Sequence, residues 1–263
     1  MSQLFVIKIG GNVIDHPGAL DSFLEDFASI PGPRILVHGG GKIATRLGEQ
    51  LGIESRYVQG RRITDDATID LVTMVYGGLV NKQVVAALQA KGCNAIGLTG
   101  ADANCIPADR RPVTTIDYGW VGDIDTSRVN VAALYALLDA GLVPVMAPLT
   151  HDGRGHILNT NADTIASSLA VALSAVYTVR LIYCFEKKGV LEDLHREDSV
   201  ISLINREGHA RLLSEGKLAD GIIPKIDNAF AAIDAGVKEV LIGDAADLRL
   251  NVGDAVSGTL IVS

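Results

Sequence analysis

The stretch "FVIKIGGNVI", Phe5 to Ile14, has the pattern of a buried strand that ends at two glycines and passes into a helix. Within "FVIKI", four apolar residues surround one charged residue, Lys8. A lone ammonium in a buried strand is costly unless an anionic group lies beside it. We therefore expect Lys8 to meet an anionic group near the end of this strand.

The composition favours a parallel sheet that helices cover on both faces. Of the 263 residues, 48% are hydrophobic but only 5% are aromatic, so Val, Ile, Leu and Ala must fill the interior. Strands buried on both faces are rich in these residues. The length suffices for one large α/β domain or for two joined lobes.

Short apolar runs, several of which end in glycine, alternate with helical patterns. The runs are "LFVIKIGG", "RILVHGGG", "NAIGLTG", "LVPVMAPL", "AVYTVRLIYC", "EVLIG" and "TLIVS". Helical patterns cover 64–92, 129–141, 161–173 and 225–236, the first with Thr64 as its expected N-cap and Gly92 beyond its last turn. This alternation predicts an α/β fold of βαβ units, which binds ligands at the carboxyl ends of its strands. Segment 105–125, with two prolines and the only Trp, predicts β-hairpins or a surface excursion.

Charge and cysteine content exclude several classes of protein. A net charge of −8 argues against binding to the phosphate backbone of a nucleic acid. The most apolar stretch, 165–185, contains Arg180 and several Ser and Thr residues, and it indicates a helix followed by a strand rather than a membrane span. Three dispersed cysteines without a C-x-x-C motif indicate reduced thiols. We therefore expect a cytoplasmic protein with no nucleic-acid or membrane partner.

Two glycine clusters, Gly10–Gly11 and Gly39–Gly41, follow predicted strands. Backbone N–H groups in such loops can bind a phosphate or carboxylate, although a tight turn without a ligand has the same letters. The P-loop motif is absent, because Leu36 replaces its first Gly and Ile43 its Ser or Thr. "GGGKIA" meets the dinucleotide fingerprint, but "VQGRRITDD" lacks the required acidic residue at the end of the next strand. A dinucleotide-binding oxidoreductase is therefore a disfavoured alternative.

A second lysine, Lys225, follows Pro224 in the first turn of a predicted helix. A cation at this position opposes the helix dipole, whereas a lysine together with a helix N-terminus forms a good receptor for phosphate. The alternative is an ordinary solvated lysine.

"LNTNAD" places Asn159, Asn161 and Asp163 at alternate positions from a strand end into a helix start. Asn161 is a suitable N-cap and Asp163 suits the first helical turn, whereas the amide of Asn159 has no capping role. Asp163 is a candidate counter-ion for the two lysines. In "QGRRITDD", the guanidinium of Arg62 is a natural bidentate partner for a carboxylate, while we expect Arg61 to be solvated.

The six histidines show no H-E-x-x-H or other metal-binding spacing, and no G-x-S-x-G motif occurs. Hydrolase and metalloenzyme functions therefore have no support, and we expect no metal-ligating residues.

Five motifs occur in the order and spacing of the amino acid kinase family, which nearly the whole chain resembles. They are "KIGG", "HGGG", "GRRITDD", "LNTNAD" and "GIIPKIDNA". Within the family the letters look closest to the N-acetylglutamate kinases, and the pairing of "GRRIT" with "LNTNAD" points away from kinases of other small carboxylates or amino acids. The resemblance implies a doubly wound α/β/α sandwich with an N-acylglutamate-binding lobe, 1–173, and an ATP-binding lobe, 174–263.

The resemblance also implies roles for individual residues. Lys8 and Lys225 match the two transition-state lysines, and Asp163 matches the aspartate that organises them. The implied substrate-binding residues are Gly40, Gly41, Arg62 and Asn159. The residues implied to contact ATP or the moving phosphoryl group are Gly10, Gly11, Asn161, Glu186, Gly189, Lys217, Leu218 and Ala219. Glu186 stands where the family usually has an aspartate.

The implied activity is Mg²⁺- and ATP-dependent phosphorylation of the γ-carboxylate of an N-acylglutamate in arginine biosynthesis, with acetyl as the default acyl group and succinyl as the alternative. Such a carboxylate, with an unperturbed pKa of about 4.3, is ionised at neutral pH and needs no general base. A non-catalytic module of the same fold would be expected to lose one of the two lysines, and both are present. The resemblance also implies a homodimer. Because the first strand begins near Met1, without the extra helix of arginine-inhibited relatives, we expect a dimer insensitive to arginine.

Overall fold

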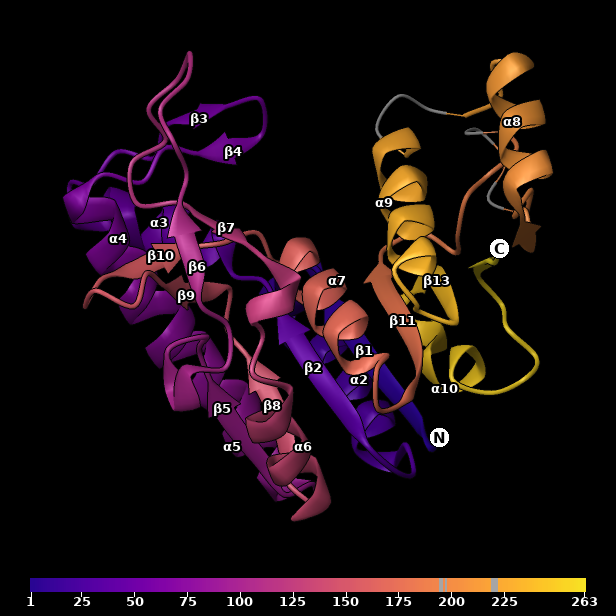
Figure 1. Ribbon diagram of the computed structural model, residues 1–263, viewed down its shortest axis with the longest axis horizontal. Coiled ribbons are helices and arrows are strands. Elements are labelled where there is room, and N and C mark those ends of the chain that lie inside the picture. The colour runs from indigo at the N-terminus through magenta and orange to yellow at the C-terminus, as the bar shows by residue number, and fades with distance from the viewer. Residues whose placement is uncertain (194–195, 197, 219–221) are drawn as a thin grey trace.

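A computed structural model describes residues 1–193, 196, 198–218 and 222–263. One eight-stranded sheet runs through its centre (Figure 1). In spatial order its strands are β12 (Leu203–Ile204), β14 (Thr259–Ile261), β13 (Glu239–Asp244), β11 (Thr178–Phe185), β1 (Gln3–Ile9), β2 (Arg34–His38), β8 (Val143–Met146) and β5 (Ala95–Leu98). The six strands from β13 to β5 are parallel, while β14 pairs antiparallel to β13. The predicted α/β fold with a mainly parallel sheet is confirmed.

Helices cover both faces of this sheet (Figure 1). They enclose two apolar cores. The helices on one face are α6 (Val131–Asp139), α7 (Ala162–Leu173) and α9 (Ile223–Asp234). The elements on the other face are α1 (Gly11–Asp15), α2 (Pro17–Ser29), α3 (Gly41–Gln50), α4 (Asp66–Val72), the π-helical η1 (Thr73–Val80), α5 (Asn81–Ala90), the short η4 (Ala245–Asp247) and α10 (Leu248–Asn251). Helix α8 (Arg206–Ser214) packs beside the edge strand β12. The layers therefore form an α/β/α sandwich.

Three small antiparallel hairpins lie beyond the carboxyl ends of β2 and β8 (Figure 1). They pair β3 (Tyr57–Val58) with β4 (Arg61–Arg62), β6 (Ala108–Arg110) with β7 (Gly122–Ile124), and β9 (Leu149–His151) with β10 (Ile157–Asn159). The β6–β7 pair confirms the hairpin expected within 105–125. Two short turns, η2 (Asp102–Asn104) and η3 (Thr126–Arg128), flank it.

The central strand β1 lies between β11 and β2, and the register brings their carboxyl ends level. Ile9 pairs with Cys184 on one side and with His38 on the other. The two predicted glycine clusters follow directly and meet, because a Cβ on Gly39 would lie 3.4 Å from the backbone nitrogen of Gly11. The predicted lobe boundary at 173/174 falls between α7 and β11. Since the sheet continues across β1 and β11, the division into lobes stays a prediction.

The long helix expected over 64–92 differs from the prediction in two ways. Its N-cap is Asp65, whose carboxylate accepts from the Thr68 N–H at 2.9 Å, so the expectation for Thr64 is wrong. Thr64 is buried, and its hydroxyl instead donates to the Arg62 carbonyl. The helix also widens into π geometry over η1, which the apolar pattern alone does not reveal.

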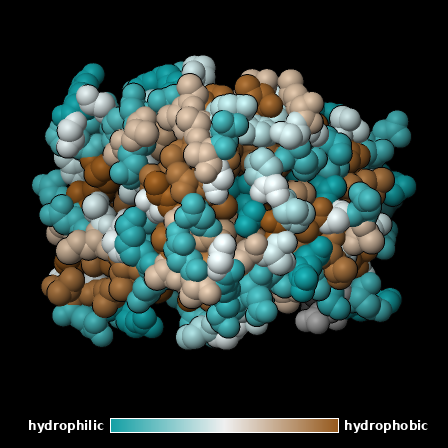
Figure 2. Space-filling model, turned by 90° about the horizontal axis from the view of Figure 1, so that it is seen from below, coloured by the Kyte–Doolittle hydropathy of each residue, from teal (hydrophilic) through white to brown (hydrophobic). Residues whose placement is uncertain are grey.

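Segment Asp66–Ala90 is the one described helical stretch whose length and composition would allow it to cross a membrane. Core helices of ordinary domains meet the same criterion, and this segment packs into the core with buried residues such as Leu71, Val80 and Leu88. On the face shown in Figure 2, hydrophobic residues form patches that hydrophilic residues interrupt.

A buried ion pair joins β11 to β13. The Nε of Arg180 donates to Oε1 of Glu239 at 2.7 Å, and both side chains are about one-tenth exposed (11% and 9%). The Nη1 of Arg180 also donates to the carbonyls of Asn251 and Gly253. The guanidinium thus links the sheet to the end of α10 and to the turn that follows it.

We expect Glu239→Ala to lower the free energy of unfolding by about 3–5 kcal/mol, because it leaves the Arg180 charge buried without its partner. Asp21→Ala serves as the control, since it removes an ion pair with Lys91 in which the Asp21 side chain is 70% exposed. That change should cost less than about 1 kcal/mol. Urea unfolding of the three proteins measures both values, and equal losses would contradict the structural role given to Arg180.

Candidate functional site

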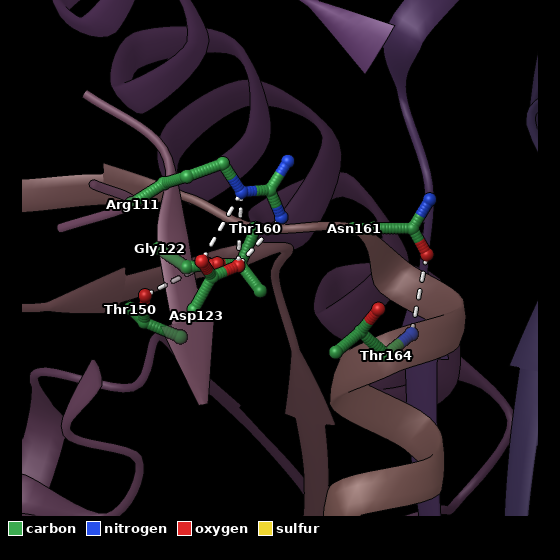
Figure 3. A network of polar contacts seen from close by, with 7 residues as sticks. All are labelled: Arg111, Gly122, Asp123, Thr150, Thr160, Asn161 and Thr164. Atoms are coloured by element: carbon green, nitrogen blue, oxygen red, sulfur yellow. Dashed lines mark hydrogen bonds and ion pairs between the residues drawn. The ribbon is translucent and has the colours of Figure 1, made fainter. Parts of the chain in front are cut away.

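Lys8 meets a carboxylate at the end of β1. Its Nζ lies 2.7 Å from Oδ1 of Asp163, with the lysine side chain 10% exposed and the aspartate 34% exposed. Asp163 lies in the first turn of α7. The side chain of Asn161 caps this helix by accepting from the Asp163 N–H at 2.8 Å and from the Thr164 N–H at 3.1 Å, and Figure 3 shows the second of these bonds. The expected N-cap and the expected pairing of Asp163 with Lys8 are both present.

Lys225 approaches the same place from the first turn of α9. Its Nζ lies 3.5 Å from the centroid of the Phe185 ring, and the Nζ of Lys8 lies 5.2 Å from the same centroid. An aromatic face attracts cations, so Phe185 offsets part of the cost of holding two ammonium groups together. Sequence reasoning missed Phe185, because an apolar residue at a strand end carries no distinguishing signal.

Burial lowers the pKa of the Lys225 ammonium below its usual value. The carboxylate of Asp163 acts in the opposite direction, and the charge of Lys8 adds to the lowering. Lys225 is thus a half-buried cation whose protonation depends on both other members of the cluster.

The first cavity has a volume of about 530 Å³ and lies beside Lys225. Its lining includes both glycine clusters and the end of β11. The lining residues are Gly10, Gly11, Asn12, Val13, Gly39, Gly40, Gly41, Lys42, Phe185, Glu186, Lys187, Gly189, Ile222, Lys225 and Ile242.

The second cavity, of about 220 Å³, lies on the other side of the same glycine loop. Its lining contains the four residues expected to bind the substrate, which are Gly40, Gly41, Arg62 and Asn159. The remaining lining residues are Gly39, Tyr57, Gly60, Arg61, Tyr76, Val121, Pro148, Thr160, Asn161 and Ala162. Because Gly39–Gly41 line both cavities, molecules held in the two would meet at this loop.

The glycines of the two clusters differ in whether the fold requires glycine at their positions. At Gly11 and Gly41 an added Cβ would contact no protein atom within 4 Å, so the fold itself does not demand glycine there. Gly40 has φ +154° and a Cβ would lie 3.0 Å from Cδ1 of Tyr76, so this residue must be glycine for the loop to close. Loop N–H groups at the starts of α1 and α3 have no intrahelical acceptor and suit an anion.

Arg62 is buried in the wall of the second cavity. Its Nη2 donates to the Gly41 carbonyl and to Oγ1 of Thr45, each at 2.9 Å, and its Nη1 contacts Oγ of Ser55. The guanidinium also stacks over Tyr57 at 4.8 Å. These contacts hold Arg62 against the glycine loop, while Arg61 is exposed as expected.

Asn159, the last residue of β10, donates hydrogen bonds to two neighbouring segments. Its Nδ2 donates to Oγ1 of Thr64 at 3.0 Å, and its N–H donates to the Trp120 carbonyl at 2.9 Å. Nearby, the hydroxyls of Thr150 and Thr160 are 2.8 Å apart beneath Gly122.

Figure 3 shows this threonine pair beside the ion pair of Arg111 with Asp123. The ion pair joins the two sides of the β6–β7 hairpin, and Thr160 precedes the Asn161 cap. The network therefore ties the hairpins to the start of α7.

Of the residues expected to contact ATP or the moving phosphoryl group, Gly10, Gly11, Glu186 and Gly189 line the first cavity, whereas Asn161 lines the second. Among the described residues, Lys217 and Leu218 lie outside that lining: Lys217 pairs with Glu192 at 2.8 Å, and Leu218 is buried in the core. Ala219 lies outside the described residues.

Within the described parts of the chain, no group of three or more His, Cys, Asp or Glu side chains is placed to hold a metal ion. Magnesium commonly binds through substrate phosphates with one or two protein carboxylates. Asp163 at the lysine cluster and Glu186 in the lining of the first cavity are carboxylates that fit such an ion.

The sequence matches the model of the amino acid kinase family over residues 3–244. The chain belongs to the amino acid kinase family. Acetylglutamate kinase from Cytophaga hutchinsonii is 57% identical over 249 residues, covering 94% of each chain. Acetylglutamate kinase from Phocaeicola vulgatus is 55% identical over 259 residues, covering 98% of each. The predicted family is thus confirmed.

Solved structures agree on the amino acid kinase fold. N-acetylglutamate synthase from Neisseria gonorrhoeae, complexed with coenzyme A and N-acetyl-glutamate, matches with a TM-score of 0.79 at 24% identity; the match covers 100% of this chain and 59% of that one. The protein smu.665 from Streptococcus mutans matches with a TM-score of 0.75 at 29% identity, over 99% of this chain and 98% of that one. Carbamate kinase from Giardia lamblia bound to AMP-PNP has a TM-score of 0.73 at 14% identity, over 100% and 98%.

The charge cluster of this amino acid kinase predicts opposite pKa changes in two variants. Lys8→Met removes a repelling charge and frees Asp163, so the pKa of Lys225 should rise, whereas Asp163→Asn should lower it. NMR titration of isotopically labelled lysine side chains measures both. A fall in the Lys225 pKa in Lys8→Met would contradict the arrangement of the three charges.

Proposed function

We propose that the chain phosphorylates the γ-carboxylate of N-acetyl-L-glutamate with ATP, as an acetylglutamate kinase in arginine biosynthesis. The observation that carries the proposal is the glycine loop shared by two cavities, with Lys8 and Lys225 beside it. ATP would occupy the first cavity, and the acylglutamate the second. The high identity to acetylglutamate kinases over nearly the whole chain supports this assignment.

The reaction brings two anions together, and the positive charges of Lys8 and Lys225 would offset the repulsion between them. A γ-carboxylate oxygen attacks the γ-phosphorus of ATP, and the bond from that phosphorus to the bridging oxygen breaks. ADP departs as the leaving group, and the acylglutamate becomes an acyl phosphate. Because the carboxylate is already ionised at neutral pH, no proton has to be removed from it. Lys225 would face the ATP side of the moving phosphoryl group and Lys8 its other flank, which stabilises charge in the transition state.

The remaining residues would orient the reactants. Asp163 holds Lys8 in place through their ion pair. Gly11, Gly40 and Gly41 would present backbone N–H groups to the phosphoryl oxygens. Magnesium, when bound with ATP, neutralises phosphate charge.

On the substrate side, Arg62 would bind a carboxylate of the acylglutamate and Asn159 its amide. An acylated nitrogen is neutral, whereas the ammonium of free glutamate would lie close to Arg62. Asn159 also has no amide to bind in free glutamate. We therefore propose that the enzyme discriminates against free glutamate.

The lobe functions and the homodimer expected from the resemblance remain part of this proposal, as does the cytoplasmic location expected from the charge and cysteine content. Exposed apolar side chains on η1, Met74 and Leu79, are compatible with a contact between copies. Light scattering would measure the oligomeric state directly.

The proposal is tested by incubating the protein with Mg²⁺-ATP and trapping acyl phosphate with hydroxylamine. Glutamate, N-acetylglutamate and N-succinylglutamate are assayed in parallel. We expect hydroxamate from an acylated substrate, by default the acetyl one, and none from free glutamate. Product from free glutamate alone, or from none of the three, would refute the proposed function.

We expect Lys8→Met to lower kcat by about a hundred- to a thousandfold, because it removes a cation that acts on the transition state. Lys91→Met is the control: Lys91 is distant in sequence, lies in neither cavity lining and pairs with Asp21 on the surface. Its kcat should match that of the wild type. A Lys8→Met protein that unfolds readily but keeps its turnover per folded molecule would make Lys8 structural.

A further inference from the structure

His38 ends β2 immediately before the glycine loop that both cavities share. Its side chain is fully buried, at 0% exposure, and both ring nitrogens have partners. Nδ1 lies 2.7 Å from the Gly39 carbonyl oxygen, and Nε2 lies 3.1 Å from Nδ2 of Asn81. The proposed mechanism gives this residue no role.

The partners of Asn81 determine which ring nitrogen carries the proton. Asn81 is buried at the start of α5, and its Nδ2 donates to the Val145 carbonyl at 2.9 Å. Its Oδ1 accepts from Nζ of Lys82 at 3.2 Å. With the amide oriented by these two bonds, Asn81 presents an N–H to His38.

The Nε2 of His38 must therefore accept, and Nδ1 must carry the proton and donate to the Gly39 carbonyl. Burial also lowers the pKa of His38 to about 4, so the ring is neutral at pH 7. A protonated ring would place two N–H groups against each other at Asn81.

This hydrogen bond sets the orientation of one peptide plane in the loop. In a planar trans peptide the C=O and N–H point in opposite directions. With the Gly39 carbonyl held toward the His38 ring, the Gly40 N–H is directed away from that ring. The Tyr76 ring fills the space beside Gly40, since an added Cβ there would lie 3.0 Å from its Cδ1.

We propose that His38 is a positioning residue for phosphoryl transfer: its Nδ1–H, assigned by the Asn81 amide, holds the Gly39 carbonyl and so aims the Gly40 N–H at the transferred group. The inference rests on the proposed kinase function of the same loop. It connects the interior of the sheet, through Val145, Asn81 and His38, to the point where the two cavities meet. Preorganised N–H donors are effective because they need no reorientation during the reaction.

Two amide variants separate this role from that of a merely buried histidine. His38→Asn places an NH₂ group near the position of Nδ1 and can still donate to the Gly39 carbonyl. His38→Gln places its amide oxygen near the position of Nε2 and can accept from Asn81, but it loses the bond to Gly39. Each variant leaves one buried polar group unpaired, so we expect similar losses of stability.

Turnover should separate them. We expect kcat of His38→Gln to fall about 10- to 100-fold, while His38→Asn stays within about fivefold of the wild type and KM changes little in both. His209→Gln, in α8 beside Phe230, is the control for replacing a buried histidine elsewhere. Thermal melting of each variant identifies an assay temperature at which all the variants are folded. Equal kcat losses in the two His38 variants would overturn the positioning role.

A second measurement does not depend on catalysis. ¹⁵N–¹H correlation spectra of the histidine rings at pH 7 distinguish the two neutral tautomers, and His38 should carry its proton on Nδ1. A proton on Nε2 would overturn the inference even if the kinase assay succeeds. A wild-type protein without kinase activity but with the Nδ1–H tautomer would refute the proposed function while supporting the hydrogen-bond arrangement.

Discussion

The ion pair between Lys8 and Asp163 is the interaction on which the arrangement of the site depends. A charged residue in the central strand is tolerated because α7 begins where β1 ends and supplies a carboxylate 2.7 Å away. That start is itself defined by the Asn161 cap, which follows β10 and lies in the lining of the second cavity. The pair therefore couples the sheet, α7 and the cavity wall. Lys225 joins from α9, so three elements distant in sequence converge on one cluster of charge.

The glycine loops meet this cluster because of sheet geometry. Parallel strands β1 and β2 end level, and each is followed at once by glycines and a helix start. Helix N-termini and side-chain-free backbone create a region that favours anions, while the neighbouring lysines add full charges. Among the described residues, Gly39, Gly40 and Gly41 are the ones that line both cavities. In-line transfer between two bound anions requires such a shared boundary.

Much of the fold and part of the candidate site could be predicted from local sequence patterns. The apolar runs matched strands, the Asn161 cap and the first-turn position of Lys225 followed from capping and proline rules, and motif order indicated the family. Predictions were weaker where several side chains compete. Asp65 rather than Thr64 caps α4, because Thr64 is engaged with the Arg62 carbonyl and with Asn159. The π-helical turn of η1 and the ring of Phe185 beneath both lysines have no short-range signature.

The sequence by itself determined the alternation of strands and helices, the positions of the glycine turns and the identity of the charged residues, because these depend on neighbours within a few positions. Only the tertiary structure decided which of them meet. The Lys8–Asp163 distance, the orientation of Arg62 toward Gly41 and the tautomer of His38 depend on contacts across 155, 21 and 43 positions of chain. Such contacts are set by strand order, register and burial, because the packing of the apolar faces determines which side chains become neighbours.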